Sequence, residues 1–414
     1  SDIDIFSAYE CLRNDKTQKR FISVLDLVKS TIMAQVDAGT LSFDPFPSAT
    51  VYIGAITSLL VHRLDKKQVD GLPELLRLLH VALESGVIDS TISSHLLSSL
   101  VPLLADANTE LAIALCPVVV QLTKHSSVAD NMIRDINNGL CMFSLSDDSR
   151  LRKAASQAIY DFKQIHGIAF DYMFELADKN PLRALTVINN IAYIAKENTW
   201  PKYVEKIISF ADNQNRAIRI KGLQILASAL YYLPVETTVA IASKYSKLGT
   251  DLSGDVLLPT AELLQAAIST LARRDLQTLK KNFPEFLHQL ILLLTVSDEE
   301  TKSLINNIIR YGIHSSISDG DIEALKPIMN EFNQVMGVQY VTIWPQLFSI
   351  LQTIPEKTGD KTFEIVGDTL MAALEKLTNV DSNYYNNILY FIVSCAEKLG
   401  LTQFFELTRL PVND

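Results

Sequence analysis

Residues 146–165 read SDDSRLRKAASQAIYDFKQI, and this stretch decides the fold. It opens with a short acidic turn, and an amphipathic segment follows at once. Apolar residues in that segment recur at the 3.6-residue spacing that places side chains on one face of a helix. The residues of this face are Leu151, Ala155, Ala158, Ile159, Phe162 and Ile165. The stretch therefore predicts a turn between two helices.

The same kind of turn recurs along the chain. Its clearest copies are Leu104–Asn108, Ser146–Ser149, Ala211–Asn215 and Val296–Glu299. The aspartates Asp106 and Asp147 of the first two copies lie 41 residues apart, and those of the last two lie 86 residues apart. Helix pairs that repeat every 40–47 residues or so are typical of HEAT and armadillo arrays. We therefore predict an all-α, HEAT/armadillo-type helical-repeat solenoid of about ten helix pairs.

No linker is long or polar enough to separate domains, so residues 1–414 are predicted to form a single continuous α-solenoid. The 65 residues from Asp147 to Asp212 break the period. They predict one irregular or three-helix repeat near residues 165–200. The sequence starts at Ser1 without a methionine, and we expect the true N-terminus to lie before this residue.

Composition narrows the class of protein. A hydrophobic content of 48% excludes disorder, and the longest apolar runs, such as Leu290–Leu294, are too short to span a membrane. The net charge of −10 differs from that of uniformly basic nucleic-acid binders, although a local basic patch can still bind phosphate. The four cysteines have no paired spacing, which favours buried thiols in a reducing compartment.

Motifs of catalytic chemistry are absent from the sequence. It has no phosphate-binding Gly-x-x-x-x-Gly-Lys, no His-Glu-x-x-His, no Cys-x-x-Cys and no Gly-x-Ser-x-Gly. The seven histidines are scattered, and neighbouring acidic residues such as Glu299 and Glu300 suit the first turn of a helix. We therefore expect a protein that is not an enzyme and that needs no cofactor and no metal.

Two basic clusters follow corresponding turns and form the candidate site. They are Arg150, Arg152 and Lys153 after the second turn, and Arg216, Arg219 and Lys221 after the third. Stacked repeats align corresponding positions, so these six residues could form a cationic ladder that binds RNA phosphates. Each arginine could instead pair with an aspartate of its own turn or of the next repeat. Both arrangements can occur together, with one cation paired to an aspartate and its neighbour free to bind phosphate.

Prolines suggest some of the helix boundaries. Thr342 is expected to cap a helix that starts near Trp344 and Pro345, because proline in a first turn gives up no needed hydrogen-bond donor. Pro284 is expected at a helix start or junction for the same reason.

Several stretches also carry a family resemblance. They are Pro47–Ala55, Ser149–Ala155, Asn198–Pro201 followed by Val204–Ile208, Trp344–Leu351, and Leu399–Asn413. In this order they resemble the N-terminal half of the ribosomal-RNA-processing protein twelve family, whose members are large HEAT-repeat proteins of ribosome assembly and export.

Because family members are much longer, the resemblance implies that this chain is the N-terminal part of a longer protein. It also implies an assembly factor of the nucleolus and nucleus that shuttles to the cytoplasm. Its expected partners are ribosome-assembly proteins, pre-ribosomal RNA of small-subunit precursors and the nuclear transport machinery, with no membrane and no small-molecule substrate. Two other functions remain open from the residues alone. One is a nuclear transport receptor of the importin-β type, and the other is the HEAT scaffold subunit of a kinase or phosphatase complex.

Overall fold

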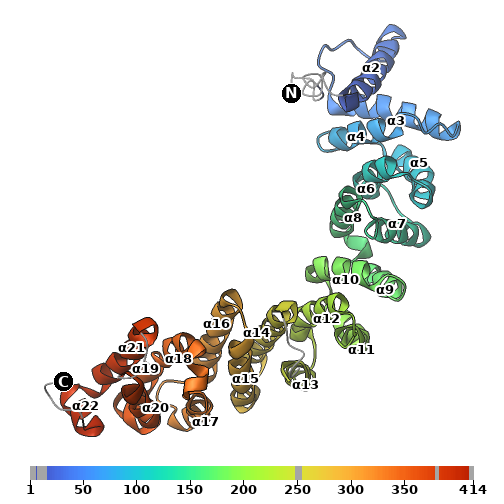
Figure 1. Cartoon of the computed structure of the whole chain (residues 1–414). Helices are drawn as coiled ribbons and strands as arrows, with labels where there is room; N and C mark the ends of the chain where they lie inside the picture. Colours follow the sequence, from blue (N-terminus) through green and yellow to red (C-terminus); the bar gives the residue numbers. More distant parts are fainter. Residues whose placement is uncertain (1–5, 7–15, 248–253, 378–381, 410–414) are drawn as a thin grey trace. The chain divides into compact units, whose positions relative to one another are not determined.

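The computed structural model describes residue 6 and residues 16–247, 254–377 and 382–409 (Figure 1). Every regular element within these ranges is a helix, and they contain no strand. The predicted all-α helical-repeat fold is therefore confirmed. The chain divides into two compact units, Ser1–Thr199 and Trp200–Asp414, and each is described by itself. Continuity of the array across the two units stays a prediction.

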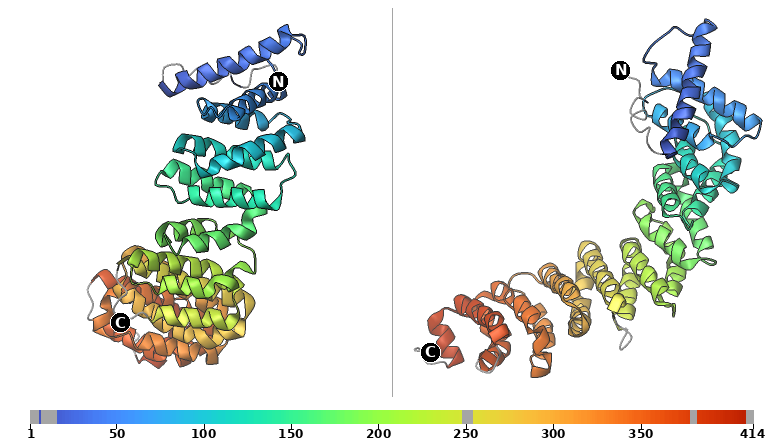
Figure 2. Two further views of the ribbon diagram at one scale, coloured as in Figure 1. Left: turned by 90° about the vertical axis from the view of Figure 1, so that its right-hand side faces the viewer. Right: turned by 45° about the horizontal axis from the view of Figure 1, so that its top comes forward.

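Unit 1 consists of helix pairs stacked in successive layers, which are seen side-on in Figure 2. Its α-helices are α2 (Lys16–Asp37), α3 (Ala49–Asp65), α4 (Leu72–Leu83), α5 (Ser90–Leu100), α6 (Thr109–Thr123), α7 (Asp130–Phe143), α8 (Ser149–Asp161), α9 (His166–Leu176) and α10 (Pro181–Asn190). Short 3-10 helices lie at η1 (Val101–Ala105), η2 (Lys163–Ile165) and η3 (Ala192–Ile194). Helices α4, α6, α8 and α10 follow one another along one side, and we call them the second-helix row; α3, α5, α7 and α9 form the first-helix row (Figure 1).

Unit 2 repeats this arrangement. Its α-helices are α11 (Thr199–Ala211), α12 (Arg216–Ala229), α13 (Val235–Ser246), α14 (Leu257–Arg274), α15 (Leu276–Val296), α16 (Glu299–Ser316), α17 (Ile322–Asn333), α18 (Trp344–Leu351), α19 (Ile354–Thr358), α20 (Thr362–Leu377), α21 (Ser382–Leu399) and α22 (Leu401–Thr408). Its 3-10 helices are η4 (Leu230–Tyr232), η6 (Gly254–Val256), η7 (Val338–Ile343) and η8 (Gly359–Lys361). Helices α12, α14, α16, α18 and α21 contact one another in sequence, as do α13, α15, α17 and α20.

Each of the four predicted turns contains the residue that caps the following helix. The side chains of Asn108, Asp148, Asn215 and Asp298 accept hydrogen bonds from backbone amides in the first turns of α6, α8, α12 and α16. Asp148, for example, accepts from the amide of Arg150 at 2.9 Å. These caps satisfy amides that have no partner within the helix. The acidic or asparagine-bearing turn is thus the physical start signal of these four helices, whereas α4 and α10 start without a side-chain cap.

Three capping aspartates give the fold an expected pH dependence. Hydrogen bonds lower the pKa of all three carboxyls. The largest contribution comes from the Arg150 side chain for Asp148, from the Thr278 side chain for Asp275, and from the Thr301 backbone amide for Asp298. A carboxyl with a lowered pKa in the folded state contributes stability above its unfolded pKa, near 4, and this is lost as pH falls through the folded value. We expect the urea concentration at the unfolding midpoint to decrease as the pH is lowered below about 4. A triple variant with asparagine in place of these three aspartates should show a smaller decrease over the same pH range. An equal fall in both proteins would contradict this role of the caps.

Side-chain bonds between neighbouring repeats fix the register of the array. Among them, Lys244 Nζ and Asp212 Oδ2 lie 2.7 Å apart over 32 residues of sequence, and His288 Nδ1 and Glu331 Oε2 lie 2.7 Å apart over 43 residues. Arg310 Nη2 likewise donates to the Ser349 carbonyl, 39 residues away, at 2.8 Å. These separations span one repeat each, so the period inferred from the turns also appears as physical contacts.

The 65 residues that break the period lie between the turns at Asp147 and Asp212. This stretch contains α8, the short helices α9 and α10 of 11 and 10 residues, and α11. Because α9 and α10 are short, this pair takes up fewer residues than a pair of longer helices would. A shortened two-helix repeat therefore accounts for the broken period.

Two expected helix boundaries are wrong. Thr342 does not cap α18, because it lies inside η7, whose Val341 carbonyl already accepts from the amide of Trp344. Pro284 lies inside α15, which starts at Leu276 behind its cap Asp275. Packing of α15 against α14, α16 and α17 holds the helix through the proline, so tertiary contacts outweigh the local propensity.

The core is apolar and continuous within each unit. Both tryptophans, Trp200 and Trp344, are among the largest buried side chains. The cysteines of the described ranges, Cys116, Cys141 and Cys395, are free and buried as predicted, and Cys11 lies outside those ranges. Burial raises the pKa of each of the three thiols to about 12, so they stay protonated at neutral pH.

Candidate phosphate-binding surface on the second-helix row

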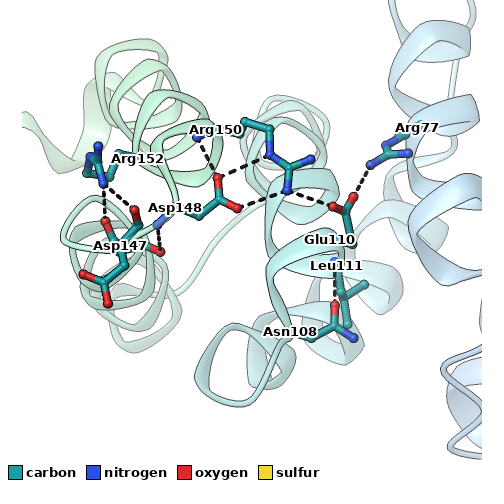
Figure 3. A network of polar contacts seen from close by, with 9 residues as sticks. Arg77, Asn108, Glu110, Leu111, Asp147, Asp148, Arg150 and Arg152 are labelled. Carbon is teal, nitrogen blue, oxygen red and sulfur yellow. Dashed lines mark hydrogen bonds and ion pairs between the residues drawn. The ribbon is translucent and has the colours of Figure 1, made fainter. Parts of the chain in front are cut away.

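A network of ion pairs around Arg150 links three consecutive helices of the second-helix row. Its Nη2 lies 3.1 Å from Oε1 of Glu110 on α6 and 3.0 Å from Oδ2 of Asp148, the cap of its own helix. The other oxygen of Glu110 lies 3.0 Å from Nη2 of Arg77 on α4. Figure 3 shows the Arg150 guanidinium between these two carboxylates. Opposite charges thus alternate along the row from α4 to α8.

The network determines what Arg150 can offer to a ligand. The Asp148 side chain, and Glu110 after it, raise the pKa of Arg150 because they favour the charged guanidinium. The side chain is 63% exposed, so these ion pairs add little to stability, but they do neutralise its charge. A phosphate would have to compete with two carboxylates for Arg150. The pairing alternative therefore describes Arg150, and its phosphate contact stays a prediction.

Arg152 holds the backbone of the turn that precedes its helix. Its Nη1 donates to the carbonyl oxygens of Ser146 at 2.7 Å and of Asp147 at 2.9 Å (Figure 3). Carbonyl oxygens are neutral, so the positive charge of Arg152 is not cancelled as that of Arg150 is. The guanidinium is thus held in place and still carries its charge.

Arg183 reaches the same turn from α10. Its Nη1 donates to the carbonyls of Leu145 and Ser146, and its Nη2 lies 2.8 Å from Oδ1 of Asp147. Asp147 is fully exposed, so this ion pair lies at the surface. The backbone bonds position Arg183 across the space between α8 and α10, beside Arg152.

Lys153 differs from the two arginines in having no partner among the described residues. It is exposed on α8, and none of the described residues pairs with its ammonium group. Of the three basic residues predicted on this helix, Lys153 is therefore the one most available to a ligand.

A groove of about 630 Å³ lies between α8 and α10. Arg152, Lys153 and Arg183 line it, and so do two exposed tyrosines, Tyr160 of α8 and Tyr193 of η3. The remaining lining is mixed: Ser144, Ser156, Gln157, Thr186 and Asn190 are polar, and Leu182, Val187 and Ile191 are apolar. The groove thus combines positive charge, hydrogen-bonding groups and aromatic faces on the second-helix row.

A larger hollow of about 1490 Å³ lies farther along the same row and has a different character. Four arginines line it, Arg20, Arg63, Arg77 and Arg150, together with the carboxylates of Asp70, Glu74 and Glu110. The three carboxylates offset most of this positive charge, whereas the α8–α10 groove is lined, among the described residues, by three cations and no carboxylate.

The second predicted cluster lies on α12, in unit 2. Arg216 is exposed at the first position of the helix and has contacts of its own, whereas Arg219 and Lys221 are half-buried. The Nε of Arg219 is buried without a hydrogen-bond partner. Because this cluster and that of α8 lie in different units, their alignment in one cationic ladder stays a prediction.

The sequence-based site omits four side chains of this surface. Tyr160 could have been found, because Lys153 and Tyr160 are separated by seven residues and so share a face of α8. Glu110, Arg183 and Tyr193 carry no such signal, since each meets α8 from another helix or turn.

Other chemistry is sparse in the described ranges. They hold no group of three or more histidine, cysteine or acidic side chains placed to bind a metal ion. Among the same residues no single helix is long and apolar enough to cross a membrane, and only the pair Tyr385–Leu399 and Leu401–Thr408, bent by 115°, passes that test jointly.

Comparison with known proteins leaves the family open. No family model and no curated protein matches the sequence. Among solved structures, an engineered protein is 17% identical with a TM-score of 0.41, over 95% of this chain and 99% of that one. A circular tandem repeat protein with a novel repeat topology is 11% identical with a TM-score of 0.28, over 94% of this chain and 97% of that one.

Proposed function

We propose that this protein is a non-enzymatic scaffold that binds RNA-containing assemblies, with the phosphate backbone held in the α8–α10 groove of unit 1. The observation that carries the proposal is the lining of that groove by Arg152, Lys153 and Arg183 beside two exposed tyrosines. Stacked helix pairs supply an extended surface, which suits a protein that holds partners. The family resemblance of the sequence adds the ribosome-assembly context, with pre-ribosomal RNA of the small subunit and assembly proteins as partners in the nucleolus and nucleus.

The charges around the groove favour a phosphate ligand over a cationic one. Arg152 and Arg183 are held by backbone carbonyls, and Lys153 projects without a partner among the described residues. Asp147 offsets only one of these three positive charges, because its one ion pair within the described ranges is with Arg183. The groove is therefore locally positive although the chain as a whole carries a net charge of −10. This arrangement makes the proposed contact sequence-independent and sensitive to salt.

Replacing Lys153 by glutamate is expected to weaken RNA binding by roughly tenfold at low salt. The change reverses the charge of a side chain that pairs with none of the described residues, so it disturbs no bond among them. It should also lower the slope of log affinity against log salt by about 0.7 for each phosphate that the groove no longer neutralises. Fluorescence anisotropy with labelled RNA over a salt series measures both quantities.

Arg134→Glu is the matched control for this measurement. Arg134 is exposed on α7, in the first-helix row, and the variant changes the net charge by the same amount. We expect it to leave affinity and slope close to those of the wild type. Equal losses in the two variants would mean that only total charge matters, and the proposal of a groove would then be wrong.

Copurification from cells tests the class of partner. If the protein acts in ribosome assembly, pre-ribosomal RNA and assembly factors should copurify with the wild type, and smaller amounts of them should copurify with Lys153→Glu. Recovery of transport cargo with a small GTPase, or of a stoichiometric kinase or phosphatase, in place of RNA would contradict the proposal and favour one of the other scaffold functions.

A further inference from the structure

Tyr160 and Tyr193 form an exposed aromatic pair at the end of the α8–α10 groove. Their ring centroids lie 5.3 Å apart with an interplanar angle of 48°. Tyr193 is 68% exposed and Tyr160 is 43% exposed. Buried aromatic rings contribute to a protein core, but rings this open contribute little to stability. Their position beside three cations points to a ligand with both flat and anionic groups.

The local structure holds Tyr160 in place. Nε2 of His166 lies 3.0 Å from the carbonyl oxygen of Ile159 and 2.8 Å from that of Tyr160, so the imidazole binds the last carbonyls of α8. Gln157 Nε2 donates to Asp161 Oδ1 at 3.1 Å across the same turn. These bonds fix the backbone that carries Tyr160, and the ring itself contacts the ring of Tyr193.

The two kinds of groups are separated along α8. Arg152 and Lys153 lie near the start of the helix, and Tyr160 lies seven residues after Lys153, or about 10 Å along the axis. Arg183 and Tyr193 flank the same groove from α10 and η3. A nucleic-acid strand can therefore place phosphates at one end of the groove and a base at the other.

We infer that the Tyr160–Tyr193 pair stacks an unpaired base, so that the groove binds single-stranded RNA in preference to a duplex. The inference rests on the proposed function and adds the structural class of the ligand. In a duplex the bases are already stacked on one another and their faces are covered, so a tyrosine ring cannot reach them without unstacking. In a single strand every base offers a face, and stacking on aromatic side chains is the common mode of recognition.

The test uses the whole chain and two RNA probes, a single-stranded oligouridylate of about 12 nucleotides and an RNA duplex of the same length. Tyr193→Ala is expected to weaken binding of the single strand by about tenfold and to leave binding of the duplex unchanged. Tyr160→Ala should act in the same way, and Tyr193→Phe should retain wild-type affinity because it keeps the ring. Circular dichroism checks that each variant is folded.

A matched control is available in unit 2. Tyr231 and Tyr232 also form an exposed pair with centroids 5.3 Å apart, but they do not line this groove. Tyr231→Ala should bind both probes as the wild type does. A loss as large as that of Tyr193→Ala would show that the tyrosines of the groove have no special role, and would overturn the inference.

The remaining outcomes separate this inference from the proposed function. If both alanine variants bind the single strand normally while Lys153→Glu weakens both probes, stacking is wrong and the phosphate groove stands. If Lys153→Glu also has no effect, the proposed function fails as well. If the wild type binds neither RNA but binds a proline-rich peptide, and the tyrosine variants lose that binding, the groove recognises a peptide and both are overturned.

Discussion

Replacing Gly222 by alanine is expected to destabilise unit 2 by about 1–3 kcal/mol. A Cβ atom at Gly222 would lie 2.5 Å from the backbone nitrogen of Ala211, 2.8 Å from its Cα and 2.9 Å from the carbonyl carbon of Phe210. These atoms belong to the backbone at the end of α11, so no side-chain rotation can relieve the overlap. Elsewhere in a helix, alanine is favoured over glycine by roughly 0.5–1 kcal/mol. At Gly222 the steric cost outweighs that gain.

Gly54→Ala is the matched control for this prediction. Gly54 also lies in a helix, α3, but a Cβ atom there has no neighbour within 4 Å among the described residues. We expect Gly54→Ala to stabilise the protein by roughly 0.5–1 kcal/mol, since only the helix propensity changes. Urea unfolding of the three proteins measures both effects. A stabilised Gly222→Ala variant would show that α11 and α12 do not approach as closely as described.

Replacing Trp344 by alanine is expected to cost more, about 3–5 kcal/mol. The indole is 2% exposed, and its ring packs edge-on to Phe348 with centroids 6.4 Å apart. The ammonium of Lys376, on α20, lies 5.5 Å from the ring centroid. Removing the side chain therefore leaves a cavity and removes the contact between α18 and Lys376 of α20. Trp344→Phe keeps one ring and should lose roughly 1–2 kcal/mol.

The location of this loss can also be measured. In a repeat array each helix pair contacts only its neighbours, so we expect hydrogen exchange of Trp344→Ala to rise in α18 and in its neighbours η7, α16, α20 and α21, and to stay unchanged in unit 1. Val338→Ala is the control, because Val338 lies in the same segment and is 73% exposed; its stability should change by less than about 0.5 kcal/mol. An equal rise in exchange throughout both units would contradict the nearest-neighbour account.

The features of the fold that depend on nearby residues could be predicted from the sequence. A capping residue acts on amides two or three residues away, so turns such as those that contain Asp148 and Asp298 could be recognised from short stretches. The apolar face of α8 is likewise a local pattern. Thr342 and Pro284 mislead because a preceding 3-10 helix and the packing of a long helix replace the local signals at those positions.

The electrostatic state of the candidate site depends on contacts between repeats, which the sequence does not display. Nothing near Arg150 in the chain reveals Glu110, 40 residues earlier, as its second partner. The Ser146 carbonyl that accepts from Arg152 also accepts from Arg183 of α10, and this sharing depends on how two repeats are offset. Basic residues are easily found in a sequence, but the exposure of Lys153 and its lack of a partner among the described residues follow only from the structure.

Ultraviolet crosslinking of the whole chain to single-stranded oligouridylate, with mass spectrometry of the crosslinked peptides, tests the central claim most directly. The claim is that the α8–α10 groove on the second-helix row holds RNA. It predicts crosslinks on peptides that contain Lys153, Tyr160 or Tyr193, and fewer of them in Lys153→Glu. Crosslinks confined to the first-helix row, or unchanged by Lys153→Glu, would contradict it.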